Sequence, residues 1–115
     1  MFGWFGKTDN GLIAADGVRR SPLWPKCRKS FLLLHPTCAA CGRKDELEVH
    51  HILPFHINPA VELAESNLMT LCDGKTRSCH RTFGHLYDWT RWNPEAVQSA
   101  ADFLRKVRMK FTWEQ

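Results

Sequence analysis

Apolar side chains recur at three- and four-residue intervals ahead of the middle of the chain, at Leu23, Cys27, Phe31 and Leu34. Ser21-Pro22 supplies a helix N-cap followed by proline at the first helical position, and His35-Pro36 stops the pattern. The spacing therefore predicts a short helix with those four side chains on its buried face.

Two short strands are predicted next. Residues 47–52 alternate weakly and include β-branched side chains, and Pro54 ends this run. Residues 53–66 are expected to form a long loop, and residues 68–71 a second strand with a turn after it. Strands followed by helices indicate an α+β fold.

Two further helices are expected after the strands. One begins near Cys79 and carries His80 and Phe83. The other begins at Asn93-Pro94, which combines an N-cap with proline at N1. Its buried face is predicted to consist of Val97, Ala101, Leu104 and Val107. We expect Trp89 and Trp92 to pack between these two helices rather than to stack on bases.

Length limits the organisation to one domain, because 115 residues are too few for two independent cores. Residues 1–20 contain four glycines and no periodic pattern, which predicts an irregular arm ahead of a single domain over residues 21–115. The longest apolar run, residues 31–34, is far short of the roughly 20 residues that cross a bilayer. The first residues also lack a secretory pattern, so we expect a cytoplasmic protein that does not bind a membrane.

Charge is distributed unevenly around a formal net value of +4. Lys and Arg dominate residues 1–30 and 71–115, whereas Asp and Glu dominate residues 31–70. Basic flanks around an acidic middle are compatible with a polyanionic partner, although a net charge of this size is also ordinary for a protein surface.

Four of the five cysteines form two pairs that suggest a structural zinc site. Cys38 and Cys41 form a C-x-x-C turn followed by glycine, and Cys72 and Cys79 flank a glycine-containing turn. Four thiolates around one Zn²⁺ would tie distant segments together. The alternative is a set of buried reduced thiols or a redox pair. Cys27 lies on the apolar helix face and is expected in the core.

Adjacent histidines on a strand point to opposite faces, so His50 and His51 cannot share one task. Downstream come Asn67 and then Cys79-His80 at the start of a helix. This order of residues, from about Cys38 to His85, resembles the HNH endonuclease family. The segments 19–25 and 92–94 are similar to a phage and bacterial subgroup of that family.

The resemblance implies a small ββα-metal (His-Me finger) domain with flanking helices. It implies His50 as a metal ligand, His51 as the general base and Asn67 as the orienting amide. A helix ligand to the same ion would be His80 or His85, and ligation by both would require a distorted turn because they are five positions apart. The ion would be Mg²⁺, Mn²⁺, Ni²⁺ or Zn²⁺, separate from the structural zinc held by the four cysteines.

The function implied is hydrolysis of DNA phosphodiester bonds, since a neutral imidazole can take a proton from water near neutral pH. The alternative is a zinc-stapled DNA-binding or protein-interaction module without catalysis, and an RNA or nicking specialist is a further rival. A homodimer or a larger phage or bacterial assembly is left open. Candidate contacts to the nucleic acid are Arg19, Arg20, Arg77, Arg81, Arg91 and His56.

Overall fold

The protein is described by a computed structural model that places residues 19–114, with side chains up to residue 109. Most of the N-terminal arm expected over residues 1–20 lies outside the described residues. The elements run in the order α2 (Trp24–Leu34), β1 (Leu47–His51), β2 (Leu68–Cys72), a single wide turn η3 (His80–Gly84) and α3 (Ala96–Glu114). Two short 3₁₀ turns, Pro59–Val61 and Glu65–Asn67, interrupt the loop between the strands.

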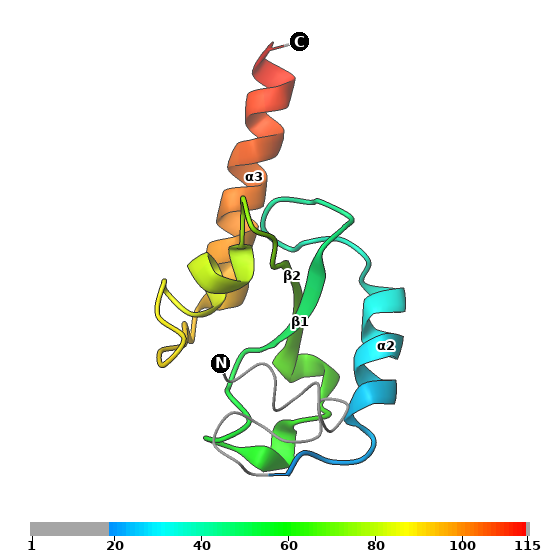
Figure 1. Cartoon of the computed structure of the whole chain (residues 1–115). Coiled ribbons are helices and arrows are strands. Elements are labelled where there is room, and N and C mark those ends of the chain that lie inside the picture. Colours follow the sequence, from blue (N-terminus) through cyan, green and yellow to red (C-terminus); the bar gives the residue numbers. More distant parts are fainter. Residues whose placement is uncertain (1–18, 115) are drawn as a thin grey trace.

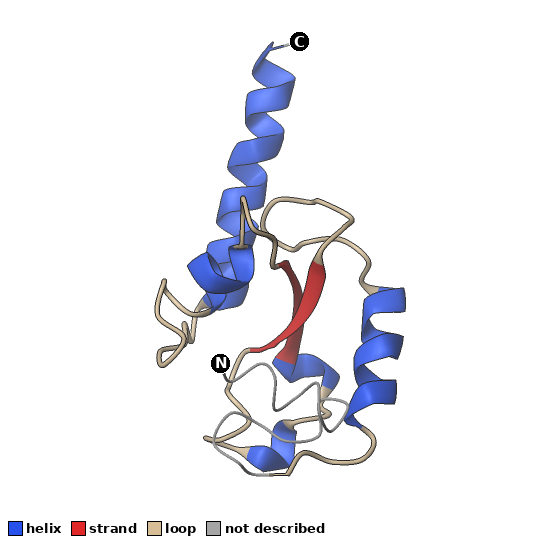
Figure 2. Ribbon diagram, viewed as in Figure 1, coloured by secondary structure: helices blue, strands red, loops and turns tan. Residues whose placement is uncertain are grey.

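The centre of the fold is an antiparallel hairpin of β1 and β2, in which His50 pairs with Met69 and His51 with Leu68. Figure 1 shows α2 beside the hairpin and α3 rising from the end of the domain that carries η3. Helices and a two-stranded sheet make up the ordered elements (Figure 2), so the predicted α+β class is confirmed. Within the described residues no helix has the length and apolar character needed to cross a membrane.

The hairpin separates two clusters of buried side chains. One joins α2 to the sheet through Trp24, Phe31, Val49 and Leu68. The other gathers the cysteine-bearing segments against α3, with Met69 and Leu71 from β2 and Ala96 and Ala100 from the helix. The second cluster places the start of α3 directly against the candidate zinc ligands.

The predicted buried face of α2 is wrong at both ends. Trp24 and Phe31 are buried, whereas Leu23 and Leu34 are 61% and 70% exposed. Helix α2 begins at Trp24 with Leu23 as its N-cap residue instead of the predicted Ser21, and the Ser21 side chain accepts from the Leu23 N–H. Residues 24 and 31 therefore share the face that meets β1, because they are two helical turns apart. Cys27 is half-buried beside this cluster, as expected.

The predicted buried face of α3 is wrong in its first half only, because Val97 and Ala101 are exposed whereas Leu104 and Val107 are half-buried as expected. Asn93 caps the helix as expected, because its side chain accepts from the Glu95 N–H at 2.9 Å. The side chains that pack inward are Ala96 and Ala100, while Val97 is 56% exposed. Small side chains allow the helix backbone to approach the cysteine-bearing loops closely, which the larger Val97 would prevent.

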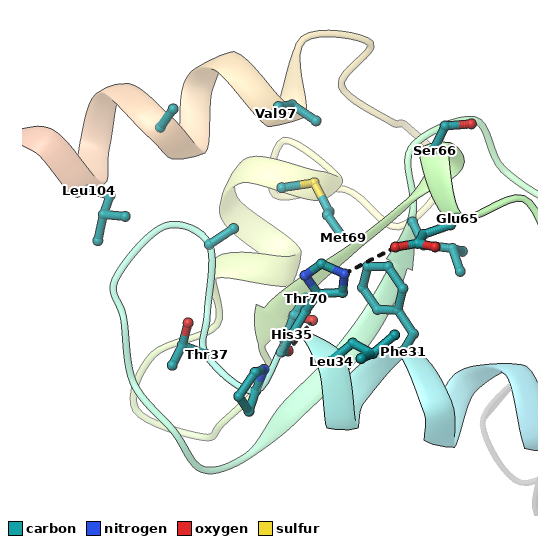
Figure 3. Close-up of a pocket in the computed structure, with 14 residues that line it drawn as sticks. Phe31, Leu34, His35, Thr37, Glu65, Ser66, Met69, Thr70, Val97 and Leu104 are labelled. Carbon is teal, nitrogen blue, oxygen red and sulfur yellow. Dashed lines mark hydrogen bonds and ion pairs between the residues drawn. The ribbon is translucent and has the colours of Figure 1, made fainter.

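An open hollow lies between the end of α2, strand β2 and α3 (Figure 3). Phe31, Met69, Val97 and Leu104 contribute to its walls, and a contact of 3.4 Å between His35 and Glu65 crosses one side. None of His50, His51, His80 and His85 lines it.

Candidate functional site

Four cysteine sulfurs converge where three segments of chain meet. Cys38 and Cys41 lie in the turn after α2, Cys72 ends β2 and Cys79 precedes η3. All four Sγ atoms lie within 4.8 Å of one another. The Cys41 and Cys72 sulfurs are 3.8 Å apart, which matches the separation of about 3.8 Å expected for two sulfurs bound tetrahedrally at about 2.3 Å. The cluster is therefore positioned to hold a metal ion.

Backbone groups around the cluster favour thiolates. The N–H of Cys41 donates to Cys38 Sγ and the N–H of Cys79 donates to Cys72 Sγ, each at 3.4 Å. Gly42, which follows the first pair, has a φ of +79° that most residues avoid, so glycine suits this turn. A hydrogen bond from the Cys79 thiol, together with backbone N–H groups, lowers the pKa of Cys38 to about 4 although burial opposes this change, and the same hydrogen bond raises the pKa of Cys79. A thiolate is the form that binds zinc.

Three histidines form a second cluster on the other side of this junction. Ligand nitrogens of His50, His80 and His85 lie within 4.8 Å of one another, and the three ring centroids are 4.9–5.0 Å apart. The Nε2 atom of His50 is buried and has no hydrogen-bond partner among the described residues. A buried polar atom without a partner carries a free-energy penalty that a metal ion would remove. The cluster therefore fits a divalent ion.

Burial keeps the His50 and His85 rings neutral. It lowers the pKa of His50 to about 2, with further lowering by the nearby His80 and His85. Burial also lowers the pKa of His85, while a hydrogen bond to the Arg91 carbonyl opposes that change. Neutral imidazole is the form that donates a lone pair to a metal.

The spacing of His80 and His85 is explained by η3, which is a π-helical turn. Its hydrogen bond runs from the His85 N–H to the His80 carbonyl at 3.1 Å, spanning five residues instead of the four of an α-helix. A wider turn brings positions five apart onto the same face. Such a distorted turn is what the sequence requires if both histidines face one ion. The structure has this turn, and it brings both rings together with His50.

Two of the three histidine rings are oriented by a contact between their Nδ1 atom and another residue. Nδ1 of His85 lies 2.7 Å from the Arg91 carbonyl, which only accepts, so Nδ1 carries the proton and Nε2 keeps its lone pair. Nδ1 of His80 lies 3.5 Å from Oδ2 of Asp73, and the other Asp73 oxygen accepts from Ser78. The His80 contact lowers the pKa of Asp73, which keeps the carboxylate charged.

His51 lies on the opposite face of β1. Its ring packs against Trp24 with centroids 4.5 Å apart, and its Nε2–H donates to the Glu62 carbonyl at 2.9 Å. The remaining nitrogen, Nδ1, therefore holds the lone pair. Burial and the nearby Arg20 guanidinium lower the pKa of His51 to about 4, and the Glu62 carbonyl opposes that change.

Asn67 ties down the loop that follows β1. Its side-chain oxygen accepts from the Leu53 N–H at 2.9 Å, and its amide donates to the carbonyls of Leu53 and Val61 at 3.0 and 3.4 Å. The loop is thus closed directly after His51 and next to Glu62, which accepts from the His51 ring.

A buried carboxylate beside His51 was missed by sequence reasoning. Glu62 is buried in the loop, accepts from the Ser21 N–H at 3.0 Å and lies 3.6 Å from the Arg20 guanidinium. Arg20 also lies over the rings of Trp24 and Phe55, at 5.3 and 5.1 Å from their centroids. No periodicity marks a loop carboxylate as buried, so the sequence offered no signal for this pair.

The other basic candidates lie on the surface. Arg19, Arg77, Arg81, Arg91 and His56 are all exposed. The backbones of Arg81 and Arg91 are hydrogen-bonded to the turn that carries His85, because their carbonyls accept from Tyr87 and His85. His56 lies near Trp92, with ring centroids 6.4 Å apart.

Trp89 is not packed between helices as the sequence suggested. Its ring contacts His80 and His85, with centroids 5.2 and 4.8 Å away, and 53% of the residue is exposed. The chain turns sharply at Leu86 and Tyr87 on leaving η3, and this turn carries Trp89 back over the histidines.

Comparison with known proteins gives one family. Residues 38–85 match the model of the family described as HNH endonuclease. This span includes the four-cysteine cluster, the three-histidine cluster, His51 and Asn67. No curated protein and no solved structure matches the chain.

Proposed function

Because residues 38–85 match the HNH endonuclease family model, we propose that the protein is a metal-dependent endonuclease that hydrolyses phosphodiester bonds of DNA. The observation that carries this proposal is the convergence of His50, His80 and His85 on one face of β1, with the neutral, oriented His51 next in sequence on the other face. A zinc-stapled binding module would need the cysteines and a basic surface but no second cluster of metal-type ligands.

The proposed metal centre consists of the three histidines. Its all-nitrogen donor set favours Zn²⁺ or Ni²⁺ over Mg²⁺, which prefers oxygen ligands. Bound there, a divalent ion would polarise a phosphate oxygen and stabilise the leaving oxygen. The four cysteines would hold the separate structural zinc.

His51 is the proposed general base. Its Nε2–H is held by the Glu62 carbonyl, so Nδ1 is left to take the proton of an attacking water. Asn67 supports this arrangement because it fixes the loop that carries Glu62. Arg20 pairs with Glu62 and stacks between two rings, so we assign it to holding this loop as well as to the DNA interface.

DNA binding is assigned to the exposed cations. The phosphate backbone would be contacted by Arg19, Arg77, Arg81, Arg91 and His56. The affinity for DNA should therefore fall as salt concentration rises. The absence of a disulfide among the five cysteines also suits the reducing conditions of the cytoplasm, where we place the activity.

The test is cleavage of supercoiled plasmid with Mg²⁺, Mn²⁺, Ni²⁺ or Zn²⁺, comparing wild type with His51→Ala, His50→Ala and His35→Ala. His35 is exposed and lies outside the histidine cluster, so His35→Ala is the matched control. His51→Ala should lose about 10²–10⁴-fold in rate without rescue by added metal. His50→Ala should instead regain part of its activity as metal concentration rises.

Three results would count against the proposal. Wild type that binds DNA and zinc but cleaves with none of the four metals would favour the binding module. Cleavage by His51→Ala within a few-fold of wild type would remove His51 as the base. Metal rescue of His51→Ala but not of His50→Ala would mean that the two roles are exchanged.

A further inference from the structure

The loop between η3 and α3 carries two exposed aromatic side chains. Tyr87 is 68% exposed and Trp89 is 53% exposed, although both lie within five residues of the buried Gly84 that ends η3. Single exposed apolar residues are ordinary, but two large rings on one short loop at the edge of a candidate metal centre form a distinct surface.

Hydrogen bonds hold this loop in place. The Tyr87 N–H donates to the Arg81 carbonyl at 2.9 Å and the Asp88 N–H to the His85 carbonyl at 3.0 Å. The Asp88 side chain then accepts from both the N–H and the hydroxyl of Thr90, at 2.9 and 2.7 Å. Trp89 is therefore fixed between two residues that are bonded to each other.

Only part of the Trp89 ring is used within the domain. It contacts His80 and His85 at interplanar angles of 74° and 52°, which leaves much of the indole open to solvent. The two contacted histidines are two of the three proposed to hold the ion. The open surface of Trp89 thus adjoins the place where the scissile phosphate would lie.

Positive charge flanks the same surface. Arg81 and Arg91 are exposed and form no ion pair within residues 19–109. Cations beside an open aromatic ring match the chemistry of a nucleotide, since the cations attract its phosphates and the ring stacks on its base. In a regular duplex each base is already stacked on its neighbours, so the ring gains a partner only where a base is unstacked.

We propose that Trp89 is a base-stacking residue that receives an unstacked base next to the phosphodiester at the histidine cluster, so that the preferred substrate is single-stranded or locally distorted DNA. This inference rests on the proposed nuclease function for the identity of the ligand. The stacking itself is a binding property and is measurable without cleavage.

The experiment uses three labelled DNA molecules of the same sequence: a single strand, its perfect duplex and the duplex with a bulge. Affinity is measured by fluorescence anisotropy in the His51→Ala background, and kcat and KM are measured with the active protein. The variants are Trp89→Ala and Trp89→Phe, with Leu33→Ala as the control, because Leu33 is 74% exposed on α2 and lies outside this loop. Metal content is measured for each variant.

Trp89→Ala should weaken binding to the single strand and the bulged duplex by about tenfold, the scale of one lost base–aromatic stack. KM for these two substrates should rise similarly with kcat little changed, while affinity for the perfect duplex stays within about twofold of wild type. Trp89→Phe should recover most of the loss, and Leu33→Ala should stay close to wild type.

Other results would overturn the inference. Equal losses on all three DNA molecules, or loss of the divalent ion from Trp89→Ala, would make Trp89 a wall of the metal centre instead. Wild type that binds and cleaves the perfect duplex as well as the other two would also overturn it. Failure of wild type to cleave with any metal would contradict the nuclease function alone, because the anisotropy measurements still decide the stacking.

Discussion

The ring of His50 lies directly on the backbone of Gly84. A Cβ atom at Gly84 would be 2.9 Å from Cε1 of His50, a separation that real Cβ atoms essentially never show, and an unusually tight 3.0 and 3.1 Å from its two ring nitrogens. β1 and η3 can therefore approach closely enough to join His50 to the other two histidines only because residue 84 has no side chain. Gly84 is a requirement of the histidine cluster that no spacing rule identifies.

Gly84→Ala should accordingly displace His50. We expect at least a tenfold loss of affinity for the catalytic ion, with overpacking costing about 1–3 kcal/mol of stability. Isothermal titration with Zn²⁺ or Ni²⁺ and thermal melting measure the two effects. Gly74→Ala is the matched control, since its Cβ would meet only the exposed carboxylate of Glu46, which can rotate away. Equal metal affinity of Gly84→Ala and wild type would disprove the packing argument.

The thiolate cluster should hold about one zinc per chain and should be needed for folding. Cys38→Ser and Cys79→Ser each remove a buried ligand, so both variants should bind less zinc and melt at a much lower temperature. Elemental analysis and circular dichroism measure these effects. Cys27→Ser is the control because Cys27 lies outside the cluster. A folded wild-type protein without zinc, or unchanged melting of Cys38→Ser, would show that the four-cysteine site is not needed for folding.

The pH dependence of cleavage should reflect the buried position of His51. An ordinary histidine base would lose activity as pH falls below about 6.5. Burial lowers the pKa of His51 to about 4, so the neutral, proton-accepting form persists at lower pH. At saturating metal, the acid limb of kcat should therefore lie below pH 6.5, in the direction of pH 4. An acid limb at or above pH 6.5 would show that another group, or an unburied His51, takes the proton.

Asp73 should affect binding of the catalytic ion indirectly, through its contact with His80. Asp73→Asn removes the charge behind Nδ1 of His80 but keeps an oxygen that can accept, so affinity for the catalytic ion should fall by about 10–100-fold. At saturating metal kcat should recover, because Asp73 is not placed to touch the substrate. Asp102→Asn, an equivalent change on α3, should alter neither quantity. Unchanged metal affinity in Asp73→Asn would make the contact incidental.

Features set by short sequence spacing were predictable. The paired strands, the two cysteine pairs and the opposite orientation of His50 and His51 each follow from local periodicity or from the order of ligands. The capping role of Asn93 was equally local, since it depends on one side chain and the next two residues.

Features set by tertiary contact were not predictable. The buried face of α2 depends on Trp24 covering His51, and that of α3 on Ala96 reaching the cysteines, neither of which is encoded in the helix's own pattern. Whether His85 joins His80 depends on the type of helical turn, which spacing alone leaves open. The positions of Glu62 and Trp89 follow from loops that fold back onto the histidine-bearing strand and turn.

The turn between Cys72 and Cys79 offers an attachment point for engineering. Both of its ends are fixed, by the sulfur cluster and by the contact of Asp73 with Ser78, while Lys75 and Thr76 at its tip are exposed. A foreign peptide spliced between Lys75 and Thr76 would leave both anchors in register. Because His80 follows directly after the second anchor, such a graft would present new recognition residues at the edge of the reaction centre while the ligand geometry stayed intact.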